Sequence, residues 1–313
     1  MPKASTAELE PAFEIFRFNA ALGAEVRCGD LRTISQDTFA CLHRAWLDNL
    51  VLLIRGQDLS NPQDLLAFGR RFGELERAPG LVKGQKLKDP NLLELAIVSN
   101  IKDEGAPIGV LGDGEAVWHT DSSFYEVPPG ASILHSLEIP PVGGNTEFAN
   151  MYQAYDAMSA DLRERVRGRT IKNDVVHNTG GQIRDGYEEG MDIRTSPGPS
   201  HPIVRTHPDT GYNTLYLGRR PYAYVNGLTV GESERLLDDM WSHATQAAFT
   251  WHHVWKVGDV IIWDNRCVLH RRDSFDPNAR RLMYRTYVKG TRPVEMPEAA
   301  AHSAHPRGLL CAE

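Results

Sequence analysis

The sequence lacks most features that would place the chain in a specialised class. Its four cysteines are too scattered for a disulfide framework or a zinc site, so we expect free thiols. The N-terminus has no basic start followed by an apolar run, and no apolar stretch approaches the roughly 18 residues of a membrane span. The net charge of −7 is not the basic excess that nucleic-acid binding needs. We therefore expect a cytoplasmic protein with neither a membrane nor a nucleic-acid partner.

Nucleotide-binding glycine motifs, internal repeats and a Gly- or Pro-rich linker are also missing. The hydrophobic content of 41% and the charged content of 24% are ordinary for a globular protein. Single all-β domains commonly reach roughly 200–250 residues, so a length of 313 residues does not force a division. We expect one domain over residues 1–313, with a core at about 15–290 and a C-terminal tail at 291–313.

Short β-like runs outnumber helical segments, and turn signals rich in Gly, Pro and Asn separate several of them. The predicted strands are Phe16–Phe18, Val51–Ile54, Leu92–Ile97, Ala131–Leu137, Thr170–Lys172, Leu215–Leu217, Val260–Trp263 and Arg281–Val288. The predicted helices run from a Ser35 cap to about Leu50, from Ser60-Asn61-Pro62 to about Phe72, over Tyr152–Val166 and over Glu232–Thr245. This pattern predicts a mainly β fold, a sandwich or jelly roll with flanking helices.

The sharpest local motif is Trp118-His119-Thr120-Asp121. Side chains at i and i+2 of a strand point to the same side, so His119 and Asp121 would present an imidazole and a carboxylate together. A histidine from elsewhere would complete the two-His, one-carboxylate triad of non-haem iron, which leaves other metal positions open. A second such spacing, His207-Pro208-Asp209, lies in a turn-forming sequence, and we interpret it as structural. The adjacent pair His252-His253 would face opposite ways on a strand and is also interpreted as structural.

A second constellation lies far downstream of the first. The run Val260–Trp263 reads as a buried strand, Asp264-Asn265-Arg266 as a tight turn, and His270 follows on the next segment. Arg281 and Arg285 are an even number of residues apart, so on one strand they would share a face. A buried arginine there could form a two-pronged, charge-assisted bond to a carboxylate.

Taken together, these blocks resemble the taurine dioxygenase / TfdA family of Fe(II)/2-oxoglutarate oxygenases over about residues 15–290. Further matching blocks are Gly23–Val26, Val51–Arg55, Phe68–Leu75, Gly143–Phe148 and Arg205–Pro208. The resemblance implies a double-stranded β-helix, that is, a jelly roll of the cupin kind. It also implies that His119, Asp121 and His270 bind Fe(II), and that Thr146 and Arg281 hold the distal carboxylate of 2-oxoglutarate.

The resemblance also implies the reaction and the kind of substrate. Arg285 matches the arginine that binds the anionic group of a small organic substrate. Glu115 stands where taurine enzymes carry a substrate-contacting asparagine, which argues against taurine itself. With O2, we expect hydroxylation beside a heteroatom, cleavage of a C–S or C–O bond, and release of succinate and CO2. Thr120–Phe124 is similar to enzymes that act on aryloxyalkanoates, and the family suggests a homo-oligomer, a dimer or a tetramer.

Two other functions fit the same three ligands. A metal-dependent hydrolase could use them but has no need for an arginine that grips a dicarboxylate. A non-catalytic, metal-bound ligand-binding module on the same fold would be expected to lose at least one of these groups, and the sequence keeps them all.

Overall fold

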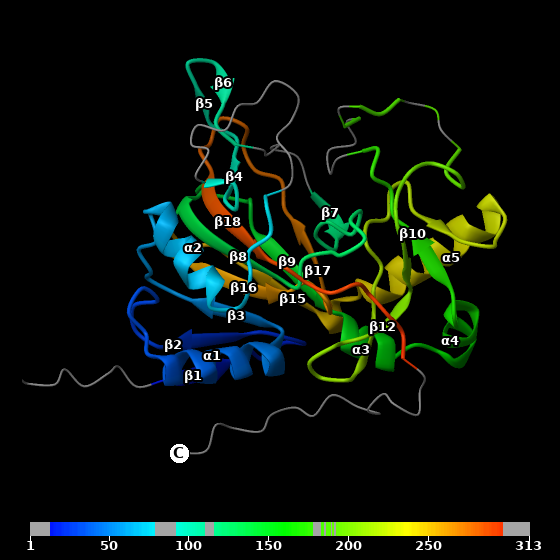
Figure 1. Cartoon of the computed structure of the whole chain (residues 1–313), viewed down its shortest axis with the longest axis horizontal. Coiled ribbons are helices and arrows are strands. Elements are labelled where there is room, and N and C mark those ends of the chain that lie inside the picture. The colour runs from blue at the N-terminus through cyan, green and yellow to red at the C-terminus, as the bar shows by residue number, and fades with distance from the viewer. Residues whose placement is uncertain are drawn as a thin grey trace, which may run out of the picture.

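Two β-sheets form the centre of the computed structural model (Figure 1). The structure describes residues 13–78, 92–109, 116–177, 183–184, 186–188, 190 and 192–296. In these ranges, no helix combines the length and the apolar character that a membrane span needs. Cys28, Cys41 and Cys267 are free thiols, as expected, and Cys311 lies outside the described residues.

The larger sheet has seven strands, and only β2 and β3 pair in parallel. Its spatial order is β1 (Glu14–Arg17), β2 (Ala24–Arg27), β3 (Val51–Ile54), β16 (Val260–Asp264), β8 (Ala131–Glu138), β18 (Leu282–Val288) and β4 (Ala96–Ser99). The smaller sheet has four antiparallel strands, in the order β15 (Thr250–His253), β9 (Thr146–Asn150), β17 (Val268–Arg272) and β7 (Ala116–His119).

Because successive side chains of a strand point to opposite faces of the sheet, neighbouring buried residues belong to different apolar layers. On β3, Val51 and Leu53 belong to one apolar cluster, whereas Leu52 and Ile54 belong to another, as the two-residue period of a strand requires. The first cluster also takes Phe148 from β9 and Val268 from β17, so it lies between the two sheets. This arrangement is the mainly β jelly roll that the sequence predicts.

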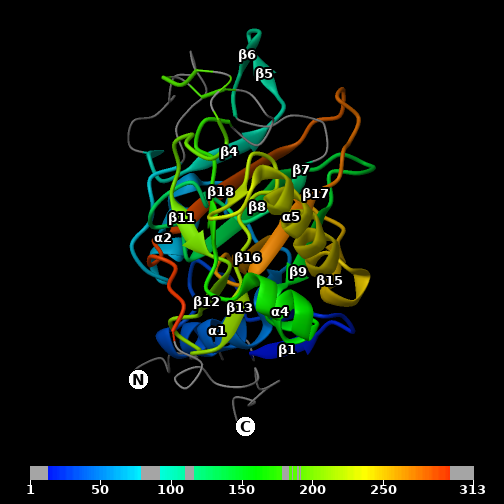
Figure 2. The ribbon, with the colours of Figure 1, turned by 90° about the vertical axis from the view of Figure 1, so that its right-hand side faces the viewer.

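Helices cover the outer faces of both sheets. On one side, α1 (Gln36–Asn49) and α2 (Pro62–Arg70) pack on the larger sheet through side chains such as Trp46 and Leu66. On the other, α3 (Met151–Asp156), α4 (Ala160–Val166) and α5 (Val230–Ala244) cover the smaller sheet (Figure 2). The remaining elements are β5 (Lys102–Asp103), β6 (Ala106–Pro107), β10 (Thr170–Lys172), β11 (Ser200–Pro202), β12 (Val204–Thr206), β13 (Asn213–Leu215), β14 (Tyr224–Val225) and a 3-10 turn, η2 (Ala247–Phe249).

Most predicted elements are present, with two informative differences. Ser35 and Asn61 cap α1 and α2 as expected. The single helix predicted over Tyr152–Val166 is wrong, because Ser159 accepts a hydrogen bond from Leu162 N–H and starts a new helix. The strand predicted from Leu92 begins only at Ala96, because the residues before it form a turn. Apolar spacing continues through both breaks, so the pattern alone could not reveal them.

A capping box at the start of α5 generates a stability prediction. Glu232 N–H donates to Thr229 Oγ1 at 3.3 Å, and Thr229 N–H donates to Glu232 Oε2 at 2.9 Å. Thr229→Ala should lower the free energy of unfolding by about 1 kcal/mol, because it leaves a helix N–H without its side-chain acceptor. Urea denaturation measures this loss, and Thr229→Ser should retain most of the stability. An Ala variant that unfolds at the same urea concentration as the parent would contradict the prediction.

Candidate metal centre

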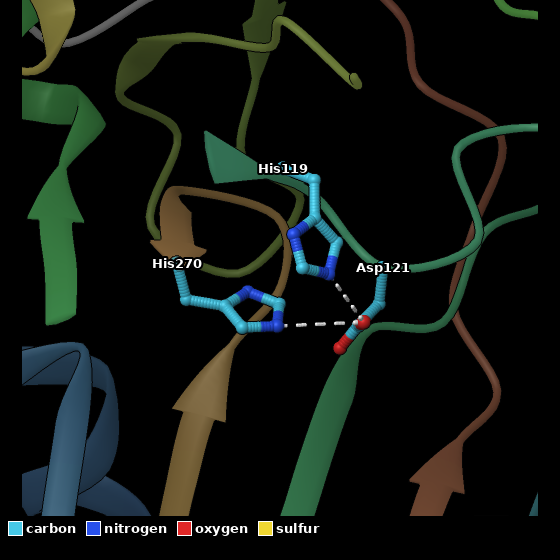
Figure 3. A group of neighbouring side chains, drawn as sticks. All are labelled: His119, Asp121 and His270. Atoms are coloured by element: carbon cyan, nitrogen blue, oxygen red, sulfur yellow. Dashed lines mark ion pairs between the residues drawn. The ribbon is translucent and has the colours of Figure 1, made fainter. Parts of the chain in front are cut away.

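Three side chains converge, two from neighbouring strands of the smaller sheet and one from the segment that follows one of those strands (Figure 3). His119 ends β7, Asp121 follows two residues later, and His270 lies opposite His119 on the neighbouring strand β17. His119 Nε2 is 3.6 Å and His270 Nε2 is 3.5 Å from the same atom, Asp121 Oδ1. The structure thus brings together the three residues that the sequence predicts as ligands.

The two imidazoles are neutral, and a neutral imidazole can bind a metal ion through its unprotonated nitrogen. His119 Nδ1 lies 2.7 Å from the Val117 carbonyl, to which only a ring N–H can donate, so the neutral ring presents a bare Nε2. Burial lowers the pKa of His119 to about 4 and that of His270 well below its usual value. His119 Nε2 and Asp121 Oδ1 are therefore acceptors that face each other, a cation between them would relieve their repulsion, and a neutral His270 can offer a third acceptor atom. Two imidazoles and a carboxylate suit Fe(II).

Asp121 does not lie on the strand, contrary to the prediction that His119 and Asp121 share one. β7 ends at His119, and Ser122 has a left-handed φ of 49°. The buried side chain of Asn265 hydrogen-bonds the backbone of Asp121 as a neighbouring strand would. Its Oδ1 accepts from Asp121 N–H at 2.8 Å, and its Nδ2 donates to the Asp121 carbonyl at 3.0 Å. The carboxylate therefore reaches the histidines through a clamped turn.

The second carboxylate oxygen of Asp121, Oδ2, has partners of its own on the larger sheet. Ser132 Oγ donates to Oδ2 at 2.8 Å, and Arg285 pairs with the same oxygen. The Arg285 guanidinium lies between the rings of Trp263 and Tyr287, 4.6 Å from each ring centre. Its Nε is buried without a hydrogen-bond partner among the described residues. Arg285 is thus bound to a metal-ligand candidate and keeps one free donor.

Arg281 is a buried cation whose charge the described residues leave unsatisfied. Its side chain is 1% exposed, and Nε and one terminal nitrogen have no hydrogen-bond partner in the described part of the chain. Burial and, to a smaller extent, the charge of Arg272 lower the pKa of Arg281 to about 9. A Cβ at Gly144 would lie 3.3 Å from Arg281 Nε, so the guanidinium packs against the segment that leads into Thr146. Contrary to expectation, Arg281 precedes β18 and does not lie on it.

Thr146 has a free hydroxyl hydrogen at this end of the site. Trp255 Nε1–H donates to Thr146 Oγ1 at 3.0 Å, so the hydroxyl can still donate to another group. Arg272 lies directly opposite Thr146 on β17 and is buried. Its charge is one of the smaller causes that lower the pKa of His119, after burial. Thr146, Arg281 and Arg272 thus lie near one another at one end of the strands that carry the metal candidates.

The histidines interpreted as structural have structural partners. His207 Nε2 contacts Asp264 Oδ2 at 2.9 Å, and its Nδ1 accepts N–H groups of the following turn. Asp264 also binds Arg266 through both oxygens, so its charge is already paired with a cation of the chain. His252 and His253 contact Asp273 and Asp259, respectively. Glu115, predicted to contact substrate, lies outside the described residues.

Four residues that contact the site were not predicted for it: Ser132, Asn265, Trp255 and Arg272. Asn265 stands in a block used for the resemblance, but nothing in its sequence neighbourhood says that it would clamp Asp121. Ser132 is an ordinary small residue in an apolar strand. Arg272 is the one with a usable signal, because it lies two residues after His270 and so shares its face.

Comparisons with known proteins agree with this geometry. The model of the family described as taurine catabolism dioxygenase TauD, TfdA family matches residues 8–287. The (S)-phenoxypropionate/alpha-ketoglutarate-dioxygenase of Sphingobium herbicidovorans is 33% identical, over 90% of this chain and 96% of that protein. The alpha-ketoglutarate-dependent 2,4-dichlorophenoxyacetate dioxygenase of Cupriavidus pinatubonensis is 37% identical, over 78% of this chain and 86% of that protein.

Solved structures extend the likeness to the fold. AAD-2 in complex with Mn(II) and N-oxalylglycine superimposes with a TM-score of 0.73 at 29% identity, covering 90% of this chain and 99% of that one. A taurine dioxygenase from Burkholderia xenovorans gives a TM-score of 0.71 at 30% identity, covering 94% and 98%.

The buried contacts of Asp264 with Arg266 and His207 lead to a prediction about stability. Although burial alone would raise the pKa of Asp264, Arg266 and His207 hold it well below its usual value. Asp264→Asn should lower the free energy of unfolding by about 3–5 kcal/mol, because it leaves the Arg266 charge buried with half its partners. Urea denaturation of the metal-free protein measures this change. Asp273→Asn, which alters a partly exposed carboxylate, is the control; equal effects of the two substitutions would contradict the prediction.

Proposed function

The chain belongs to the taurine catabolism dioxygenase TauD, TfdA family and is a 2-oxoglutarate-dependent oxygenase, and on that premise we propose roles for its buried polar side chains. His119, Asp121 and His270 hold Fe(II), and Arg281 and Thr146 hold the distal carboxylate of 2-oxoglutarate. We also propose that the whole chain forms one dioxygenase domain, which the nearly end-to-end match to a curated relative supports.

The observation that carries this proposal is the buried guanidinium of Arg281, whose Nε and Nη1 have no hydrogen-bond partner among the described residues. A buried charge without a partner destabilises a fold, so its presence calls for an anion that arrives from outside the chain. A carboxylate meets that need with two parallel, charge-assisted hydrogen bonds. The Thr146 hydroxyl adds a neutral donor, and Trp255 holds that hydroxyl in place. A dicarboxylate with one end on the metal and the other on Arg281 fits this arrangement.

When bound, Fe(II), 2-oxoglutarate and O2 supply the oxidising chemistry, which places one oxygen atom in succinate and one in the substrate and releases CO2. The chain contributes position and charge. Neutral histidines leave Nε2 free to bind, and the apolar side chains between the sheets keep water out. Arg285 Nε is a buried donor without a partner among the described residues, and Arg285 is our candidate for binding the anionic group of the substrate. We assign Glu115 to the substrate as well, on the resemblance alone.

We propose an aryloxyalkanoate as the substrate class. The support is the name of two relatives, a phenoxypropionate and a dichlorophenoxyacetate dioxygenase, at 33% and 37% identity. Hydroxylation of the carbon that bears the ether oxygen would give a hemiacetal, which collapses to a phenol and an oxoacid. A sulfonate would be cleaved by the same logic to sulfite and an aldehyde, and it remains the second candidate.

The two alternative functions make different demands on Arg281. A hydrolase with the same metal ligands would hydrolyse its substrate without O2 and would not depend on a dicarboxylate. A ligand-binding module would bind metal and carboxylate without turnover. The buried donor pair of Arg281 and Thr146 favours the oxygenase over the hydrolase.

Arg281 can be tested against its neighbour. Arg281→Ala should raise the KM for 2-oxoglutarate by about 30-fold or more, because losing one partner of a buried charge pair costs about 2 kcal/mol or more. Arg280→Ala is the matched control, since Arg280 is largely exposed and pairs with Glu138. Initial rates of succinate formation at varied 2-oxoglutarate give both values. An unchanged KM in Arg281→Ala would assign the cosubstrate to another residue.

A substrate panel tests the function as a whole. Aryloxyalkanoates, alkyl sulfonates and alkyl sulfates are incubated with Fe(II), 2-oxoglutarate and O2, and succinate is measured against a substrate-free control. We expect the largest stimulation from an aryloxyalkanoate, with one phenol formed per succinate. Stimulation by sulfonates alone would overturn the substrate class, and hydrolysis in the absence of O2 would overturn the oxygenase itself.

A further inference from the structure

The two oxygens of the Asp121 carboxylate have different surroundings. Oδ1 faces both histidines, at 3.6 and 3.5 Å from their Nε2 atoms. Oδ2 is turned to the larger sheet, where Ser132 Oγ donates to it at 2.8 Å and Arg285 pairs with it. Ser132 is fully buried, and its Oγ accepts in turn from Arg285 at 3.3 Å. The hydroxyl is thereby oriented, and its hydrogen points at Oδ2.

The backbone of Asp121 is held by hydrogen bonds, as its side chain is. Asn265 binds both the N–H and the carbonyl of Asp121, and it also donates to the Pro129 carbonyl at 2.9 Å. Asn265 is 1% exposed and sits in the turn between β16 and β17, the strand that carries His270. One amide side chain therefore couples the position of Asp121 to the hairpin that supplies the third ligand.

We propose that Ser132 and Asn265 are positioning residues that make Asp121 a one-oxygen ligand. Asn265 fixes where the carboxylate stands, and Ser132 keeps Oδ2 occupied, so that only Oδ1 is offered to the metal. This inference rests on the proposed function, because it takes Asp121 as a ligand. Its consequence is chemical: an octahedral ion with three one-atom protein ligands keeps three open positions, and a second carboxylate oxygen would take one of them.

The fold supplies a matched pair of serines for the test. Ser132 and Ser136 lie on β8, four residues apart, and both are fully buried. Ser136 Oγ donates to the Lys256 and Asp259 carbonyls, away from the metal candidates. Each Ser→Ala substitution removes one buried hydroxyl from the same strand, but only one of them touches Asp121.

Co(II) titration of the metal-free, full-length protein separates positioning from stability. Ser132→Ala should weaken Co(II) binding about 10-fold or more, the usual effect of removing an outer-shell partner, and should change the visible absorption of bound Co(II). Ser136→Ala should lower the urea midpoint but leave Co(II) affinity and spectrum unchanged. Ser132→Thr, which keeps the hydroxyl, should restore both. Asn265→Asp keeps the acceptor for Asp121 N–H but loses both donated bonds, and it should weaken Co(II) binding as well.

Each outcome of the Co(II) titration bears on either the positioning role or the proposed function. If Ser132→Ala binds Co(II) like the parent, or loses no more affinity than Ser136→Ala, the positioning role is wrong. If Asn265→Asp does not fold, the serine pair still decides. His119→Ala is included as a reference that should lose the site altogether. If the parent protein has no Co(II) site that His119→Ala removes, the proposed function fails together with this inference.

Discussion

The burial of charge between two apolar sheets is the constraint on which this structure depends. Arg281, Arg285 and Asp121 all lie within the jelly roll, on a layer otherwise made of side chains such as Phe148 and Trp263. Asp121 and Arg285 neutralise each other, whereas Arg281 has no counter-charge in the described part of the chain. Under the proposed function, the distal carboxylate of 2-oxoglutarate supplies the missing counter-charge.

The same constraint explains how the ligand set is built. A strand alone could not present Asp121 beside two imidazoles, because β7 ends at His119. The chain uses a turn instead and satisfies its backbone with Asn265 from the opposite hairpin. Burial keeps His119 neutral, and the Val117 carbonyl fixes its tautomer. The position of Asp121 and the protonation state of His119 therefore depend on different residues, so a substitution can alter one without the other.

Much of this was readable from the sequence, and the rest has physical reasons for being hidden. The short β-like runs Val51–Ile54 and Thr170–Lys172 were predicted with their observed bounds, because both are short and mostly buried strands with clear ends. The convergence of His119, Asp121 and His270 was also predicted, through the resemblance. The contacts of Ser132 and Asn265 with Asp121 span 11 and 144 residues and leave no periodic trace. Nor could the sequence tell that Arg285 pairs with Asp121, since the two residues are 164 positions apart, on β18 and in the segment after β7.

The central claim is that one ion and one dicarboxylate complete this site together. Crystals grown without oxygen with Mn(II) and N-oxalylglycine, an inert analogue of 2-oxoglutarate, test it most directly through the anomalous signal of the metal. We expect a single metal peak bonded to His119 Nε2, Asp121 Oδ1 and His270 Nε2, with the distal carboxylate of the analogue on Arg281. A metal bound elsewhere, or an Arg281 that still lacks a partner in the complex, would contradict the account.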